Sequence, residues 1–470
     1  MLRGRFGRTV LRRRDGPAPA TVLDAERWSG LCRAAVTGRP ETVEALLDAL
    51  RAAVDGGLPY DRAAALDALL RSPPELLPHL DRGARARGAP SVPLRPGGAD
   101  PLRLLLASLD RDGHVRQAAV EALTGVGGPL AAAALALRTV DWVPAVRERA
   151  VAALPARTAP DEVAAALRLL LRLGGRRRAG GQPAGYRAVL AEPAYRRAVR
   201  ALAADGDPRT RRFGMELALE LGEYVRGDLL RTALRDRDQV CRRLCAERLL
   251  EIDPDQAGRL MWARSAAVRE LAVAALPVDV PAARLVSVLA DPARMVRAQA
   301  RWQLYRRGEP PARVYRRQLG RCGPGGPAGL VAGLLAGLGE CGDATDVPVL
   351  LRFTGPGAGP GAGPGPEPGA GPGPVARPAR VRRCAVRALG RLAPADDLVR
   401  LLAPLVLDPD PGVAREVFEA LARVAAQVPA ETVWVGRTRT EPAVRRAAER
   451  LAPDAGAAPV RSSRGTDRGR

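Results

Sequence analysis

Two cysteines one helical turn apart are the clearest candidate for chemistry in this sequence. Cys241 and Cys245 could form a redox pair or supply two thiolate ligands to a metal ion. Both residues, however, occupy core positions of a repeated apolar pattern, which favours buried, reduced thiols. The six cysteines of the chain are irregularly spaced and do not indicate a disulfide framework.

Other residues that carry out catalysis are scarce. The chain has no Lys, which excludes a Walker A phosphate loop and a Schiff-base lysine. Two His residues and no GxSxG motif argue against a Ser-His-Asp triad or a multi-His metal site, and His114 is expected to be an ordinary turn residue. The acidic pairs Asp396–Asp397 and Asp408/Asp410 stand at predicted helix starts, where capping explains them better than acid–base catalysis. We therefore expect no enzymatic activity and no cofactor.

Composition indicates closely packed helices and an acidic partner. Hydrophobic residues make up 47% of the 470 residues but aromatic ones only 3%, so the core consists of small and medium side chains. The net charge is +23, and all 74 basic residues are Arg. A single Ile (Ile252) and the absence of Lys and Asn indicate a GC-rich coding bias, which explains part of the Arg excess. The charge still favours an acidic protein surface, a nucleic acid or a membrane surface as partner.

The sequence shows no targeting or spanning segment. The first residues are basic but lack the apolar run of a signal peptide. No segment approaches the roughly 18 apolar residues of a membrane span. These features predict a cytoplasmic protein without a membrane span.

The elements that position these residues are repeats. The skeleton Asp-x4-Val-Arg-x2-Ala-x3-Leu occurs at 110–123 and again at 141–154. Most copies follow one another at intervals of 27 to 32 residues, and two longer intervals of 64 and 85 conceal degenerate copies. The Val position is occupied in turn by Val115, Val146, Thr210, Cys241, Val268, Val296, Val381, Val413 and Val444. Weaker copies at 61–69 and 330–338 bring the total to about ten or eleven units.

Each repeat predicts a pair of helices. The Val, Ala and Leu positions are spaced four residues apart and form one helical stripe, and an apolar helical segment precedes each copy. One such pair is too apolar to be stable alone, so neighbours must stack. Because no segment shows sustained strand alternation, the predicted fold is all-α: an α-solenoid of stacked antiparallel helix pairs. Asp-Pro at 100–101, 207–208, 253–254, 291–292 and 408–409 is expected to open helices, with Asp as the N-cap.

The Asp and Val-Arg positions resemble those of HEAT-repeat proteins over about residues 40–453. The resemblance implies a curved superhelix whose concave face is lined by the second helix of each pair. It also implies a ladder of Asp and Arg side chains that bridges successive repeats. The ladder residues would be Asp110 and Arg116, Asp141 and Arg147, Asp205 and Arg211, Asp236 and Arg242, and Asp291 and Arg297.

Several positions depart from the family pattern. Ala263, Ala376 and Arg439 stand where Asp is expected, and Ala414 replaces the Arg. We expect these joints to be looser or capped in another way.

The repeats are interrupted by segments of different composition. We expect disordered basic tails at 1–20 and 454–470, and HEAT-like repeats at 21–353 and 379–453. Loops are expected at about 83–99 and 174–185. A Pro/Gly-rich insertion at 354–378 falls between the two helices of one repeat. It is interpreted as a loop, with a Pro-rich ligand for a partner as the alternative.

Second-helix residues indicate where a partner would bind. Pairs such as Arg415/Glu419 balance one another, whereas others are like-charged or aromatic. The candidate partner-binding residues are Trp302, Tyr305, Arg306, Arg307, Arg383, Arg387, Arg446 and Arg450. For Trp302, packing against a neighbouring helix is the favoured interpretation and contact with a partner is the alternative.

The favoured function is a scaffold that binds a partner protein through its concave face. Nucleic-acid or other polyanion binding is the alternative. HEAT-like DNA glycosylases and bilin-lyase-like proteins are further possibilities, but no catalytic motif of either kind is found in this sequence. The oligomeric state stays open.

Overall fold

The computed structural model describes residues 23–56, 59–87, 92–94, 100–175, 182–323, 325–355 and 377–451. These residues form 26 α-helices and six short 3₁₀ turns, and the only β-type pairing among them is a single bridge between Leu23 and Tyr60. The predicted all-α fold is confirmed. The expected tails at 1–20 and 454–470 lie outside the described residues.

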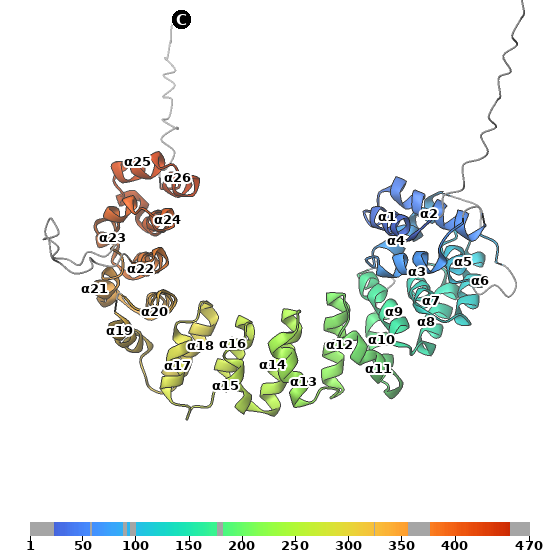
Figure 1. The fold of residues 1–470 in the computed structure, drawn as a ribbon, viewed down its shortest axis with the longest axis horizontal. Helices are drawn as coiled ribbons and strands as arrows, with labels where there is room; N and C mark the ends of the chain where they lie inside the picture. Colours follow the sequence, from blue (N-terminus) through green and yellow to red (C-terminus); the bar gives the residue numbers. More distant parts are fainter. Residues whose placement is uncertain are drawn as a thin grey trace, which may run out of the picture. The chain divides into compact units, whose positions relative to one another are not determined.

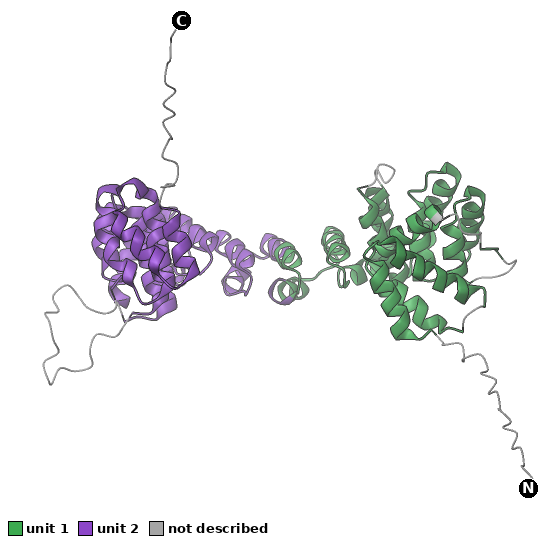
Figure 2. Ribbon diagram, turned by 90° about the horizontal axis from the view of Figure 1, so that it is seen from above, with its two compact units in different colours: residues 1–232, 236–245 green, residues 233–235, 246–470 purple. Residues whose placement is uncertain are grey.

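The chain divides into two compact units (Figure 2). Unit 1 comprises residues 1–232 and 236–245, and unit 2 comprises residues 233–235 and 246–470, so the division passes through α13 and α14. The first fourteen helices, shown from blue to light green in Figure 1, are α1 (Ala25–Ala35), α2 (Pro40–Val54), α3 (Arg62–Arg71), α4 (Leu76–Arg87), α5 (Pro101–Ser108), α6 (Gly113–Thr124), α7 (Pro129–Arg138), α8 (Pro144–Ala153), α9 (Pro160–Leu173), α10 (Gln182–Leu190), α11 (Arg196–Leu202), α12 (Pro208–Glu220), α13 (Arg226–Arg235) and α14 (Gln239–Ile252).

The helices that follow α14 belong to unit 2. They are α15 (Ala257–Leu260), α16 (Ala266–Ala274), α17 (Ala282–Leu289), α18 (Arg294–Tyr305), α19 (Pro311–Cys322), α20 (Ala328–Cys341), α21 (Val347–Leu351), α22 (Ala379–Leu392), α23 (Ala395–Leu402), α24 (Pro411–Leu421), α25 (Ala430–Thr438) and α26 (Pro442–Glu449).

Many neighbouring helices pack in pairs, and successive pairs pack on one another within each unit. Helix α5 contacts α6, α7 contacts α8, and the same holds for α17 with α18 and α25 with α26. Second helices of successive pairs also touch, as α6 does with α8, α16 with α18, and α22 with α24 and α24 with α26. This is the stacking of a HEAT-like α-solenoid, in which the apolar faces of each pair are covered by its neighbours.

The repeated skeleton supplies the buried stripe of the second helices. The Val position is buried in eight of the nine copies, and the Ala and Leu positions that follow it are buried wherever the structure describes them. The exception is Val115, which is half-buried because α6 turns Arg116, Ala119, Val120 and Leu123 inward instead. Small residues bring backbones together at other contacts: a Cβ on Gly333 of α20 would lie 2.1 Å from the carbonyl oxygen of Ala290.

Predicted loops and caps differ from the structure in detail. Helix α4 continues to Arg87 and α10 begins at Gln182, so the loops expected at about 83–99 and 174–185 are shorter than predicted. Helix α4 continues because Ala84 in its last turns is still buried, and α10 begins one turn before Tyr186, which is buried.

The Pro/Gly-rich segment at 354–378 lies almost entirely outside the described residues. It connects α21 to α22, which contact one another. The division between the two units therefore does not fall at this insertion.

The Asp-Pro prediction is right at two sites, wrong at two and partly right at Asp253. Asp253 precedes the short 3₁₀ turn Pro254–Gln256, but its carboxylate accepts a bond of 3.1 Å from the Gln256 side chain and makes no capping bond to a backbone N–H of the turn. Asp100 and Asp207 are N-caps of α5 and α12, and each accepts a hydrogen bond from a backbone N–H of the first turn. Asp291 and Asp408 are not N-caps, because α18 and α24 begin three residues after them. Their carboxylates bind arginines of the preceding repeat instead.

Candidate functional site

The Asp–Arg ladder is best developed between α6 and α8. The Arg116 guanidinium donates two hydrogen bonds of 3.0 Å to the two carboxylate oxygens of Asp141, and both side chains are fully buried. Arg138 donates a third bond of 2.9 Å to the same carboxylate. Burial alone would raise the pKa of Asp141, but the hydrogen bonds from Arg116 and from the Val143 N–H, together with both Arg charges, lower it. Asp141 is thus held ionised between two repeats.

The same bridge recurs in both units. Arg269 donates to both Asp291 oxygens at 2.7 and 2.9 Å. Arg382 donates to both Asp408 oxygens at 2.8 and 2.7 Å. The Arg211 to Asp236 pair is longer, at 3.6 Å. In each case the Arg belongs to one repeat and the Asp to the next, as the HEAT resemblance implies.

Each ladder Asp also shapes its own turn. The carboxylates of Asp110, Asp141, Asp205, Asp236 and Asp291 each accept a bond of 2.7 to 3.0 Å from the N–H two residues later. The ladder Arg of the same repeat donates to the carbonyl of that Asp or of a neighbouring turn residue, for Arg116, Arg147, Arg211, Arg242 and Arg297. The Asp and Arg of one repeat therefore stabilise the turn of that repeat as well as its contact with the neighbouring repeat.

The pattern changes where a ladder Asp is missing. Arg242 keeps its bond to the Asp236 carbonyl at 2.6 Å, but its buried Nε has no partner among the described residues. Arg297 turns to Glu340 of α20, which also receives a bond of 2.6 Å from Arg301. Burial would raise the pKa of Glu340, but these two guanidiniums lower it. Arg439, in place of Asp, donates to the Asp408 carbonyl at 3.3 Å, and position 376 lies outside the described residues.

The cysteine pair is part of the core. Cys241 and Cys245 of α14 are fully buried, and burial raises the pKa of each thiol to about 12. At neutral pH both are protonated and poor nucleophiles. Among the described residues, no cluster of three or more His, Cys, Asp or Glu side chains is placed to hold a metal ion.

A stacked pair of exposed aromatic rings lies on one face of α18. Trp302 and Tyr305 stack with ring centroids 5.9 Å apart, and they are 55% and 67% exposed. Met295, two turns before Trp302, is 53% exposed. Arg294 and Arg306 are exposed at the two ends of this face, and neither has an ion-pair partner within the described part of the chain. We call Arg294, Met295, Ala298, Trp302, Tyr305 and Arg306 the α18 face.

Arg307, by contrast, is a structural residue. Its guanidinium donates to the Val280 carbonyl at 3.2 Å, to the Pro277 carbonyl at 2.5 Å, and to Gln303 at 2.6 and 2.7 Å. Gln303 is itself buried and donates to carbonyls at the end of α16. Arg307 therefore ties α18 to the preceding turn, and its guanidinium is less free for a partner than the sequence indicates.

The C-terminal arginines are also less free than the sequence indicates. Arg387 of α22 donates to Glu416 of α24 at 2.7 Å, and Arg450 lies 3.8 Å from Glu419. Helix α24, which packs between α22 and α26, thus compensates two charges that were predicted to be uncompensated. Arg446 donates to the Pro442 carbonyl at 3.2 Å. Arg383 has no ion-pair partner in the described ranges.

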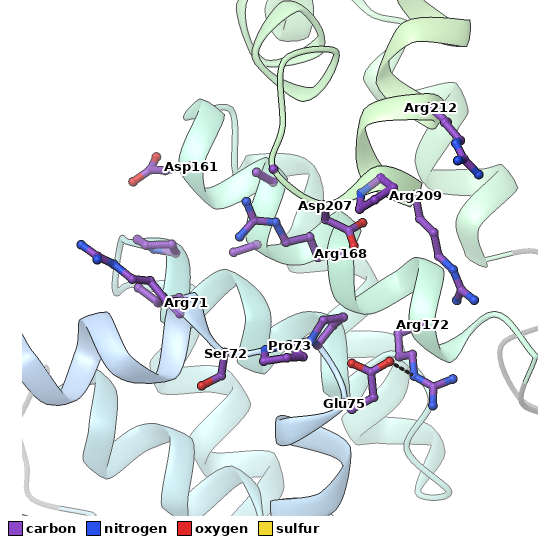
Figure 3. Close-up of a pocket in the computed structure, with 17 residues that line it drawn as sticks. Arg71, Ser72, Pro73, Glu75, Asp161, Arg168, Arg172, Asp207, Arg209 and Arg212 are labelled. Carbon is purple, nitrogen blue, oxygen red and sulfur yellow. Dashed lines mark ion pairs between the residues drawn. The ribbon is translucent and has the colours of Figure 1, made fainter. Parts of the chain in front are cut away.

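Unit 1 contains a groove that the sequence does not indicate. Its volume is about 960 Å³, and it lies between the α3–α4 connection, α9 and the start of α12 (Figure 3). Five arginines line it, and four have carboxylate partners: Arg71 with Asp67, Arg168 with Asp205, Arg172 with Glu75, and Arg212 with Asp238. The fifth, Arg209, has none among the described residues. The charges that line the groove are therefore largely balanced.

The groove also lacks an activated nucleophile. The Ser72 hydroxyl donates to the Ala68 carbonyl at 2.7 Å, and the Asp207 carboxylate accepts the Thr210 N–H at 2.8 Å. Both groups are engaged in local structure.

Across the described residues, no helix has both the length and the apolar character that crossing a bilayer requires.

Comparison with known proteins identifies no sequence family. No family model matches the chain, and no curated protein matches it. Among solved structures, it superposes on Kap121p with a TM-score of 0.33 at 13% identity, over 91% of this chain and 53% of that protein. The superposition on importin beta has a TM-score of 0.30 at 14% identity, over 91% and 57% of the two chains. A protein of the microtubule polymerase TOG domain arrays matches with a TM-score of 0.21 at 13% identity, over 82% and 90%.

The chain spans about half the length of the karyopherins it matches. At these TM-scores, the fold assignment rests on the stacked helix pairs and the Asp–Arg ladder themselves. Those features define a HEAT-like α-solenoid.

Proposed function

We propose that this chain is a non-enzymatic HEAT-like scaffold that binds a partner protein, with the α18 face in the contact. The observation that supports it most is the stacked, exposed pair Trp302–Tyr305 beside exposed Met295. Exposed aromatic and Met side chains are costly to leave in water and are enriched at binding surfaces, as is Arg. Helix α18 is the second helix of its pair, the position expected to line the concave face.

The charges of this face define the partner's chemistry. Arg294 and Arg306 stand at the two ends of an apolar centre, and neither is neutralised within the described residues. A complementary segment would place an apolar side chain on the Trp302–Tyr305 stack and acidic residues at both ends. Such charges mainly set the rate and specificity of association, whereas the aromatic centre supplies affinity.

Polyanion binding is the second candidate, and it rests on the distribution of charge. Fourteen of the 74 Arg but only four of the 51 acidic residues lie outside the described ranges, so these segments carry +10 of the net +23. Basic segments of this kind bind nucleic acids without sequence preference. The described repeats, in which most bridging arginines face carboxylates or carbonyls, favour the protein partner.

Affinity purification with two substitutions tests the scaffold proposal. Trp302→Ala and Arg306→Glu should each release the same partners from the full-length chain, with the aromatic substitution costing about 2 kcal/mol or more, about 30-fold in affinity. Trp262→Ala is the matched control, because Trp262 is 66% exposed in unit 2 but lies outside the α18 face. An unchanged set of partners with both α18 variants would reject the proposed surface.

Oligonucleotide binding tests the second candidate. If the basic segments bind a polyanion, affinity for duplex DNA, single-stranded DNA or RNA should fall steeply with salt, with a slope in log K of about −0.9 per phosphate neutralised on duplex DNA. Failure to bind any of the three at about 100 mM salt would remove this candidate.

A further inference from the structure

A second apolar groove lies at the last helix pair of unit 2. It has a volume of about 860 Å³ and is lined mainly by α25, by the turn before it and by Leu451 after α26. Helices α25 and α26 are labelled in red at the end of the coloured chain in Figure 1. Val428, Val433 and Leu451 form its apolar wall, and Trp434 is 65% exposed beside it. A Trp this exposed at the edge of an apolar groove is a feature of binding surfaces.

Two charges frame Trp434 symmetrically on the same helix. Glu431 precedes it by three residues and Arg437 follows it by three, and both line the groove. Both are exposed, and neither has an ion-pair partner in the described part of the chain. One acidic and one basic residue at equal spacing from a central aromatic residue make this surface complementary to itself.

We propose that α25 is a homodimer contact, in which a second copy of the chain packs its α25 antiparallel on the first. A twofold axis passing beside Trp434 sets each Glu431 at the height of the partner's Arg437, because the rotation reverses the helix direction. Because positions three before and three after Trp434 lie about 60° to either side of it on a helix, the two α25 helices must cross obliquely for two ion pairs to flank a Trp434–Trp434 contact. Contacts of this kind, in which one patch faces itself, are characteristic of twofold dimers.

The size of the surface sets the expected affinity. A nine-residue helix is roughly 13 Å long, so an interface centred on α25 is small compared with the roughly 1,200 Å² of a stable complex. We therefore expect a reversible dimer with a dissociation constant of about 10 to 100 µM. This inference does not depend on the proposed partner-binding function of α18.

Sedimentation of the full-length chain between about 1 and 200 µM, a range that brackets the expected constant, tests the proposal. The wild type should shift from monomer to dimer across this range. Glu431→Arg and Arg437→Glu each replace two attractive pairs by two repulsive ones, and each should weaken the dimer about 10-fold or more. The double variant carrying both changes restores opposite charges and should return to within about threefold of the wild type. Trp434→Ala should weaken the dimer about 10-fold, while Trp262→Ala leaves it unchanged.

A cross-link locates the twofold axis independently. Trp434→Cys places a thiol beside the axis, so under mild oxidation a disulfide should join the two substituted positions of a dimer. A monomeric wild type at 200 µM would overturn the proposal, as would a double charge variant as weak as either single one. If a chain that ends at Leu451 dimerises while the full-length chain does not, the residues after Leu451 occupy the groove and the proposal is wrong.

Discussion

Removing the Asp141 carboxylate should strongly destabilise unit 1. Asp141→Asn keeps the size of the side chain but leaves the fully buried guanidinium of Arg116 without its carboxylate, and Arg138 loses one of its two. Breaking a buried ion pair by removing one partner costs about 3 to 5 kcal/mol. With a urea m-value of about 2 to 3 kcal/mol/M, the unfolding midpoint should fall by at least about 1 M.

The assay is urea unfolding followed by circular dichroism at the helical band, with a matched substitution as control. Asp67→Asn removes the carboxylate of an exposed pair with Arg71 in the same unit, which should cost about 0.5 kcal/mol or less. If Asp141→Asn shifts the midpoint no more than Asp67→Asn does, the ladder does not stabilise the joint and the reasoning is refuted.

The same carboxyl gives the unfolding free energy a defined pH dependence. The pKa of Asp141 is lowered in the folded state, so its stabilising effect is present above the unfolded pKa of about 4 and is lost as pH falls through the folded value. The difference in free energy of unfolding between wild type and Asp141→Asn should therefore be constant from pH 7 to about 5 and shrink on acidification below that. A difference that stays constant down to about pH 2 would contradict the assigned ionisation.

Two further predictions concern the core. Burial raises the pKa of the Cys241 and Cys245 thiols to about 12, so both should resist alkylation at pH 8 until the protein is denatured. The partly exposed Cys322 should react in the native state. Mass spectrometry of the labelled peptides measures this, and equal labelling of all three cysteines would contradict the burial of Cys241 and Cys245. Gly333→Ala should lower the unfolding midpoint, at a cost of about 1 to 3 kcal/mol, because the added Cβ would collide with the Ala290 carbonyl. Gly320→Ala is the control: its Cβ meets no atom, so the change should be neutral or slightly stabilising. Equal effects of the two substitutions would show that the backbones at Gly333 and Ala290 are not in close contact.

The repeat pattern was sufficient to predict the fold and much of the ladder. A stripe of Val, Ala and Leu four residues apart has one stable arrangement, a helix buried on that face, and the buried positions from Val146 to Val444 confirm it. The resemblance to HEAT repeats, carried by the Asp and Arg positions, implied the bridges between successive repeats that are seen from Arg116 to Asp141 and from Arg211 to Asp236.

Contacts between residues on different helices were harder to predict. Arg269 and Arg382 occupy the expected Arg position, but their bridges were not predicted because the turns of their own repeats lack the Asp. Each of these arginines binds the Asp of the following repeat. Glu340 offers no sequence signal, because its approach to Arg297 depends on how α20 is rotated against α18.

The candidate site was predicted only in part. Packing of Trp302 against a neighbour was the favoured interpretation of the sequence, but its side chain is 55% exposed, because it falls off the buried stripe of α18. The engagement of Arg307 with the Val280 carbonyl could not be foreseen, because it depends on the path of the turn before α17. Neutralisation of Arg387 by Glu416 follows from helix packing that spacing within one helix does not report.

Site-specific photo-cross-linking tests the central claim, partner binding by the α18 face, most directly. A photoreactive amino acid is placed at Tyr305 in the full-length chain and, in a separate control, at Trp262. The account predicts that position 305 alone links to a defined protein segment in which acidic residues flank an apolar one. Identical products from both positions, or products that contain only nucleic acid, would contradict it.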